Sequence, residues 1–170
     1  IYPYIKALFQ NPVLIGVTLL VGGIAIILTE KKYSKALQLG DVKGSHDITL
    51  KQALILGCYQ ALAIVPGVSR SGAVIVGGLF HNIERRLLTE FTFLLAVPTM
   101  LVATAYSMLK HRELLLHGSF TVPLLVGFVT SFIIATIVVK FLLSYIKKHS
   151  FTVFGIYRII IGVLIIAVFM

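Results

Sequence analysis

The sequence predicts an all-α fold: a polytopic membrane protein with about four transmembrane helices plus one re-entrant hairpin made from a broken helix. Hydrophobic residues make up 58% of the chain, whereas soluble domains contain about 45–50%. Four apolar runs are long enough to cross a bilayer, and a fifth apolar region is interrupted by the heptapeptide PGVSRSG, residues 66–72. These observations favour a membrane protein over any soluble class.

The charge distribution supports the membrane assignment. The chain has 15 Lys and Arg against 6 Asp and Glu, a formal net charge of +9. Such an excess often marks a nucleic-acid-binding protein, but here the basic residues fall between apolar runs, as the positive-inside rule describes for membrane loops. We therefore expect the membrane, and no nucleic acid, as a partner. The single Cys excludes an intrachain disulfide, and no His pair has metal-ligand spacing.

The spans follow from runs of about 20 mostly apolar residues. Asn11 and Pro12 predict the start of the first helix, because proline suits a first turn. The hydrophilic stretch Glu30–Lys51 is expected to be a cytoplasmic loop. The predicted spans are Pro12–Leu28, Phe91–Leu109, Val122–Ile146 and Phe151–Met170. Together they predict one integral-membrane domain, residues 1–170, and the start at Ile1 suggests the later part of a longer protein.

The broken region Ala53–Phe80 contains apolar pieces of 13 and 8 residues, and neither can cross a bilayer alone. It either crosses as one broken helix or enters and leaves at one face. Outside the apolar segments, full crossing would place seven and five basic residues on the two faces, and re-entry nine and three. The second distribution obeys the positive-inside rule better. We expect a hairpin that enters from the cytoplasm, with the C-terminus outside.

The heptapeptide has the residues of a turn that exposes a helix start. Pro66 ends a first half-helix, and Gly67 turns where a side chain would clash. Ser69 can cap the second half-helix, whose N-terminal amides form an anion site. Arg70 adds a cation whose planar fork matches two phosphate oxygens. Non-helical backbone at membrane depth must line protein or a wet cavity, so the heptapeptide predicts a phosphate-binding pocket.

Other interpretations of these residues fit less well. A Walker P-loop requires a Lys that is absent, and a GxSxG nucleophile motif is one residue shorter. A simple helix kink with Arg70 reaching towards headgroups would not need two serines and two glycines. Arg158 lies about 10 Å into the last span. Two interpretations stay open: a functional role, and a guanidinium that extends to the nearer membrane surface. Glu90 is interpreted as a partner of Arg85 or Arg86, or as a supporting residue of the site.

The acidic residues limit the chemistry that the chain can supply. None of them lies within an apolar run; they are Glu30, Asp41, Asp47, Glu84, Glu90 and Glu113. Hydrolysis of a phosphoanhydride normally combines charge stabilisation with activation of the nucleophile. The sequence therefore predicts a phosphate clamp without an intramembrane base or metal ligand. An alternative function is a transporter or flippase of an anionic polyprenyl phosphate lipid, because broken helices serve that purpose too.

Three stretches resemble the integral-membrane undecaprenyl-diphosphate phosphatases of the bacitracin-resistance family, and the resemblance covers essentially the whole chain. They are PGVSRSG after GCYQALAIV, TEFTFLLAVP at residues 89–98 and FGIYRIIIG at residues 154–162. The resemblance implies hydrolysis of undecaprenyl diphosphate to undecaprenyl phosphate at the outer face of the bacterial plasma membrane. This reaction recycles the lipid carrier for peptidoglycan synthesis and underlies bacitracin resistance. It also implies an inverted-repeat fold with two re-entrant hairpins.

The resemblance assigns roles to residues of the heptapeptide. Arg70, Ser69 and Ser71 would be catalytic and bind the diphosphate, with binding favoured over nucleophilic attack for the serines. Gly67 and Gly72 would let backbone amides reach the phosphates. A divalent cation, Mg²⁺ or Ca²⁺, is implied as cofactor, with ligands mostly absent from this chain. A homo-oligomer stays open.

This sequence also departs from the family pattern. The family's earlier hairpin, with its glutamate-rich motif and a conserved Ser and His, has no counterpart here, so the resemblance does not extend to activity of the chain alone. Val74 stands where the family usually has a threonine, which removes one hydroxyl from the expected pocket.

Overall fold

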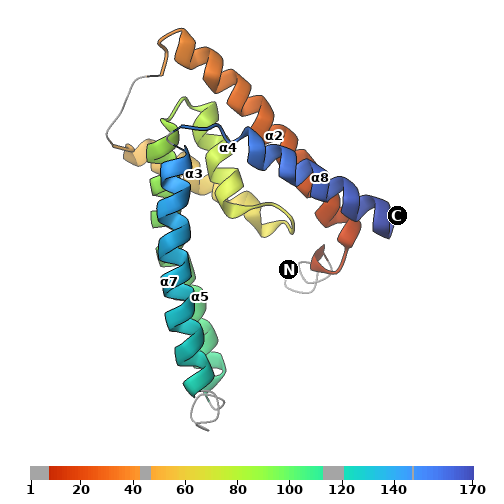
Figure 1. Cartoon of the computed structure of the whole chain (residues 1–170), viewed down its shortest axis with the longest axis vertical. Coiled ribbons are helices and arrows are strands. Elements are labelled where there is room, and N and C mark those ends of the chain that lie inside the picture. The colour runs from red at the N-terminus through yellow and green to blue at the C-terminus, as the bar shows by residue number, and fades with distance from the viewer. Residues whose placement is uncertain (1–7, 43–46, 113–120, 147) are drawn as a thin grey trace. The chain divides into compact units, whose positions relative to one another are not determined.

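The structure, a computed structural model, describes residues 8–42, 47–112, 121–146 and 148–170. Regular structure in these ranges is helical, which confirms the predicted all-α class (Figure 1). The long helices α2, α5, α7 and α8 are each long and apolar enough to span a membrane, whereas α3 and α4 are shorter. The helices are α2 Pro12–Gln38, α3 Leu50–Ala61, the 3₁₀ turn η1 Leu62–Ile64, α4 Arg70–Phe80, α5 Arg85–Lys110, α7 Thr121–Ile146 and α8 Thr152–Phe169.

The chain divides into two compact units. The first comprises residues 1–92 and 149–170 and contains α2, α3, α4, α8 and the first turns of α5. The second, residues 93–148, contains the rest of α5 and α7. The candidate site lies in the first unit, and the single membrane domain stays a prediction. Of the basic residues counted in the loops, Lys6, Lys43 and Lys147 lie outside the described residues.

Helix starts and ends follow local chemistry, and two predicted boundaries were wrong. The Asn11 side chain accepts a hydrogen bond from the Leu14 amide at 3.1 Å, which confirms the predicted start of α2. However, α2 continues ten residues past Leu28, to Gln38, so the first part of the expected loop is helical. Lys, Glu, Ala and Gln in this part favour helix, and Tyr33 is buried in it. Likewise α5 begins at Arg85, six residues before the predicted start.

A seam of four glycines joins α2 to α8. Gly16 and Gly23 lie seven residues apart on α2 and face Gly162 and Gly155 on α8, so the two helices run antiparallel. A Cβ atom at Gly23 would stand 2.6 Å from the Gly155 carbonyl oxygen, and one at Gly162 would stand 2.7 Å from the Gly16 carbonyl oxygen. Small residues allow this close backbone approach between membrane helices. The seam thus fixes α8 along α2.

Gly23→Ala is expected to lower the free energy of unfolding by about 1–3 kcal/mol, because the added methyl group overpacks a backbone contact. Gly57→Ala is the matched control, since a Cβ atom there meets nothing within 4 Å, and alanine in a helix interior should stabilise by about 0.5–1 kcal/mol. Unfolding of detergent-purified protein, followed by circular dichroism, measures both. Equal effects of the two substitutions would contradict the seam.

The broken region forms a hairpin that lies along α2. At its tip the Thr18 hydroxyl donates to the Pro66 carbonyl at 2.7 Å. At the other end of the hairpin the Lys32 ammonium donates to the Phe80 carbonyl at 3.4 Å. Thr18 and Lys32 are fourteen residues apart, or about 21 Å along a helix. Since α3 packs against α4, the chain turns beside the N-terminal half of α2 and returns, which is the geometry expected of a re-entrant hairpin.

Candidate functional site

The turn of the hairpin together with the first residues of α4, residues 65–72, is called the tip below. Val65 is extended (ψ 127°), as expected for a residue before proline. Gly67 has φ +83°, where a side chain is strained. A Cβ atom at Gly67 would also overlap the Thr18 hydroxyl and stand 2.8 Å from the Ile15 carbonyl oxygen. The predicted role of Gly67, a turn with no room for a side chain, is confirmed.

Thr18 is a residue of the site that sequence reasoning missed. Its hydroxyl lies 2.7 Å from the Pro66 carbonyl oxygen, closer than the 3.0 Å that separates it from two carbonyls of its own helix. Sequence offers no signal for this contact, because threonines in apolar helices usually bond within their own helix. This bond attaches the tip to α2.

Thr18→Val is expected to destabilise the protein by about 1 kcal/mol, because the buried Pro66 carbonyl loses its donor. Thr29→Val is the matched control, since the Thr29 hydroxyl bonds only to carbonyls of its own helix at 2.8 and 3.1 Å. The unfolding midpoint of each variant is measured in mixed micelles. A Thr18→Val variant as stable as Thr29→Val would show that the bond contributes nothing.

The first turn of α4 carries the polar residues of the heptapeptide. Ser69 is the N-cap: its hydroxyl oxygen accepts from the Gly72 amide at 3.1 Å and lies 3.0 Å from the Ser71 hydroxyl. This confirms the predicted cap. Arg70 and Ser71 are exposed in the first turn. The N-terminus of α4, with its partial positive charge, therefore lies beside a guanidinium and two hydroxyls.

Arg158 joins the last span to the tip. Its Nη2 atom donates to the Gly67 carbonyl at 2.9 Å, and a Cβ atom at Gly22 would stand 2.7 Å from the same nitrogen. Its buried Nε atom has no hydrogen-bond partner among the described residues. Of the two roles left open from sequence, this placement favours the functional one, because the side chain lies against the hairpin.

A cavity of about 370 Å³ lies between α2, the hairpin and Arg158. Most of its lining is aliphatic, and its polar members include Thr18, Ser69 and Arg158. Of the residues assigned from the heptapeptide, Ser69 and Gly72 line the cavity, whereas Gly67, Arg70 and Ser71 do not. The structure thus gathers these residues at one tip but divides them between the cavity and the exposed first turn of α4.

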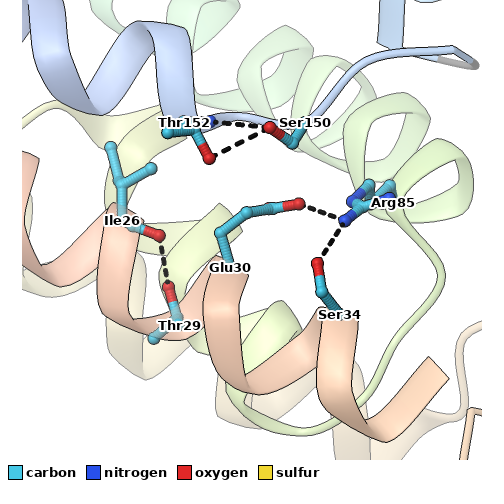
Figure 2. Close-up of polar contacts among 7 residues, drawn as sticks. All are labelled: Ile26, Thr29, Glu30, Ser34, Arg85, Ser150 and Thr152. Atoms are coloured by element: carbon cyan, nitrogen blue, oxygen red, sulfur yellow. Dashed lines mark hydrogen bonds and ion pairs between the residues drawn. The ribbon is translucent and has the colours of Figure 1, made fainter. Parts of the chain in front are cut away.

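A buried carboxylate corrects the interpretation of the acidic residues. Glu30 was assigned to a loop, yet it lies within α2, is 2% exposed and forms an ion pair with Arg85 (Figure 2). Arg85 also donates to the Ser34 hydroxyl at 3.3 Å. Of the two partners predicted for Glu90, Arg85 and Arg86, the structure pairs it with Arg86, whose Nε atom lies 2.9 Å from the carboxylate. The apolar runs alone could not reveal Glu30, because α2 continues beyond its run.

The residues at the tip do not fit a divalent cation. Among the described residues, none that lines the 370 Å³ cavity carries a carboxylate, and Arg158 places a cation in its wall. The described residues contain no group of three His, Cys, Asp or Glu side chains that could hold a metal. Divalent cations such as Mg²⁺ and Ca²⁺ require oxygen ligands, mainly carboxylates. No step below is therefore derived through the cation that the resemblance implies.

The fold and the tip define a class of protein: a helical membrane protein whose broken-helix hairpin presents an N-terminal helix turn with an arginine, next to a mainly aliphatic cavity that a second arginine lines. The chain belongs to the family described as bacitracin resistance protein BacA, whose profile matches residues 1–164. The resemblance inferred from the three stretches is thereby confirmed.

Relatives of the chain are named undecaprenyl-diphosphatase. One from Campylobacter jejuni is 46% identical over 94% of this chain and 58% of its own length. One from Aquifex aeolicus is 42% identical over all of this chain and 65% of its own length, and one from Ectopseudomonas mendocina is 45% identical over 92% and 55%. The chain thus spans less than two thirds of the length of these relatives.

Proposed function

We propose that the chain supplies the diphosphate-binding hairpin of an undecaprenyl-diphosphate phosphatase. The reaction adds water across the phosphoanhydride of undecaprenyl diphosphate and releases undecaprenyl phosphate and inorganic phosphate. The observation that carries the proposal is the tip, where the start of α4, Arg70 and two serines lie together. The family membership and the names of the relatives support it.

The tip would act mainly by charge stabilisation. The fork of Arg70 and the α4 N-terminus would bind the diphosphate oxygens, which gain negative charge as the anhydride breaks. The Ser69 hydroxyl oxygen already accepts a hydrogen bond from the Gly72 amide and lies beside the Ser71 hydroxyl. These contacts support a binding role for Ser69 rather than nucleophilic attack. The group that activates the attacking water would be supplied by a counterpart of the segment of the relatives that this chain does not cover.

The proposed orientation places the base of the hairpin in the cytoplasm. Exposed basic side chains gather there: Lys31, Lys32, Lys35 and Arg86. The tip would lie about 21 Å from Lys32 along α2 and open towards the outer face. This arrangement would serve recycling of the lipid carrier for peptidoglycan synthesis in the bacterial plasma membrane, and with it resistance to bacitracin.

Transport of an anionic polyprenyl lipid without hydrolysis is the second candidate. In the part of the chain that the structure describes, no carboxylate that could serve as a base lines the cavity, and half-helix N-termini that face anions are a transporter feature as well. This alternative shares the binding step and differs in whether phosphate is released.

One experiment separates the two. The chain is assayed alone and together with the segment of the Campylobacter jejuni relative that it does not cover; this combination is called the complemented protein. We expect phosphate release from undecaprenyl diphosphate by the complemented protein and none by the chain alone. Movement of the lipid between leaflets of vesicles without phosphate release would refute the enzyme and favour the transporter.

A further inference from the structure

We propose that the buried ion pair of Glu30 and Arg85 is a positioning pair, which sets how far along α2 the hairpin tip is held. The proposal rests on the proposed function for its kinetic consequence, although its structural consequence can be measured without any activity. Glu30 is 2% exposed and the Arg85 side chain is 21% exposed. The pair lies at the base of the hairpin, far from the residues that would touch substrate.

Arg85 is held to α2 by three residues that lie on one face of the helix, at positions i, i+3 and i+4. Besides the ion pair, it donates to the Ser34 hydroxyl at 3.3 Å (Figure 2). Its guanidinium carbon stands 4.7 Å from the centre of the Tyr33 ring. Tyr33 is itself 2% exposed. A guanidinium held by a carboxylate, a hydroxyl and an aromatic face has one preferred position, so the start of α5 cannot slide freely along α2.

The start of α5 is in turn joined to α4 by a short connection that is hydrogen-bonded back to α4. Only four residues separate the two helices, and Asn82 among them adopts a left-handed conformation, φ 56°. The Ile83 amide donates back to the Gly78 carbonyl at 3.0 Å, and Ile83 is buried. A displacement of Arg85 along α2 would therefore carry α4 and Ser69 with it.

The spacing of the contacts on α2 matches the length of α4. Thr18, which bonds the tip, and Glu30, which holds the base, are twelve residues apart, or about 18 Å. The eleven residues of α4 extend about 16 Å. Thus α2 contacts the hairpin at both ends of α4. The base contact determines where the tip meets Arg158, which donates to Gly67 from α8.

The ionic character of the pair supports a role in setting the position of the hairpin along α2. A buried ion pair contributes little net stability, and apolar residues of similar size often replace one without loss. The attraction between a carboxylate and a guanidinium nevertheless weakens as they move apart, whereas apolar side chains tolerate sliding. We infer that the pair favours one position of the hairpin along α2 over positions that are shifted along the helix axis.

The structural test measures the distance between spin labels at Leu28 and Ile64 by pulsed electron paramagnetic resonance. Both side chains are exposed, at 60% and 62%, and neither lines the cavity. The exposed Cys58 is replaced by alanine, and the chain is studied in lipid nanodiscs. We expect one narrow distance for the parent, broadened or shifted distances for Glu30→Gln and Arg85→Gln, and recovery in the exchanged pair Glu30→Arg/Arg85→Glu. Arg86→Gln, an adjacent exposed arginine, is the matched control and should keep the parent distance.

The kinetic test uses the same variants in the complemented protein. A misplacement of about 1 Å can cost about 100-fold in rate, so kcat should fall in each single variant by up to that factor while KM changes little. Kinetic recovery in the exchanged pair should accompany recovery of the distance. If the parent complemented protein releases no phosphate, the proposed function is refuted. The distances between the spin labels would still decide whether the ion pair positions the hairpin.

Parent-like distances in Glu30→Gln and Arg85→Gln would overturn the proposal. If the single variants do not fold, the exchanged pair decides: a folded protein with the parent distance supports a positioning role, and a folded protein with an altered distance refutes it. Equal broadening in Arg86→Gln would also refute it, because the effect would then follow from loss of charge anywhere at the start of α5.

Discussion

Arg70→Ala is expected to lower kcat/KM for undecaprenyl diphosphate by about 100- to 1000-fold in the complemented protein, the range measured when one charge-stabilising donor is removed from an active site. Arg70 stands in the first turn of α4, next to the serine cap, where its charge adds to that of the helix N-terminus. Arg70→Lys should also reduce the rate, though less, because lysine keeps the charge and lacks the bidentate fork. Phosphate release in nanodiscs measures both variants.

The control for Arg70 is Arg86→Ala, which removes an exposed arginine that pairs with Glu90 on α5. This variant should keep nearly the parental rate, since exposed ion pairs contribute at most about 1 kcal/mol to stability. Near-parental turnover by Arg70→Ala would remove Arg70 from the mechanism. A loss of equal size in Arg70→Ala and Arg86→Ala would indicate a general effect of surface charge.

Gly67→Ala is expected to destabilise the protein by roughly 2–5 kcal/mol and to reduce turnover with it. A left-handed alanine costs about 1–2 kcal/mol, and crowding against the Thr18 hydroxyl and the Ile15 carbonyl adds about 1–3 kcal/mol. Comparison with Gly40→Ala separates the cost of backbone strain from the cost of crowding. Gly40 has φ +76° and open space around its Cβ position, so that variant should lose only about 1–2 kcal/mol.

The second measurement on Gly67 is a double variant. Thr18→Ala removes the hydroxyl that the new methyl group would overlap, and it leaves the Ile15 carbonyl in place. Thr18→Ala/Gly67→Ala should therefore be less destabilised than the sum of the two single variants. Strict additivity of the two effects, or equal losses in Gly67→Ala and Gly40→Ala, would contradict the crowding of the tip against α2.

The fold was predictable where an apolar run and a helix coincide. Asn11 and Pro12 identify the start of α2, and the predicted spans Val122–Ile146 and Phe151–Met170 lie within one residue of α7 and α8 at each end. Prediction failed where a helix continues past its apolar run. Glu30 looked solvated because lysines follow it, and only the fold shows that Arg85, far along the chain, pairs with it.

The candidate site was predictable to the extent that its residues act locally. The cap by Ser69 and the turn at Gly67 depend on neighbours within the heptapeptide, so residue chemistry was enough to identify them. The contact from Arg158 to Gly67 joins residues 91 positions apart. From the sequence, a functional role for Arg158 and a side chain reaching to the near membrane face were both open, and no spacing rule could name the partner.

The most direct test of the central claim, that the tip binds the diphosphate of a polyprenyl lipid, is hydrogen–deuterium exchange of the complemented protein in nanodiscs. We predict that undecaprenyl diphosphate slows amide exchange in residues 66–72, that undecaprenol, which has no phosphate, does not, and that Arg70→Ala abolishes the slowing. Unchanged exchange at these residues, or equal slowing by undecaprenol, would contradict the account.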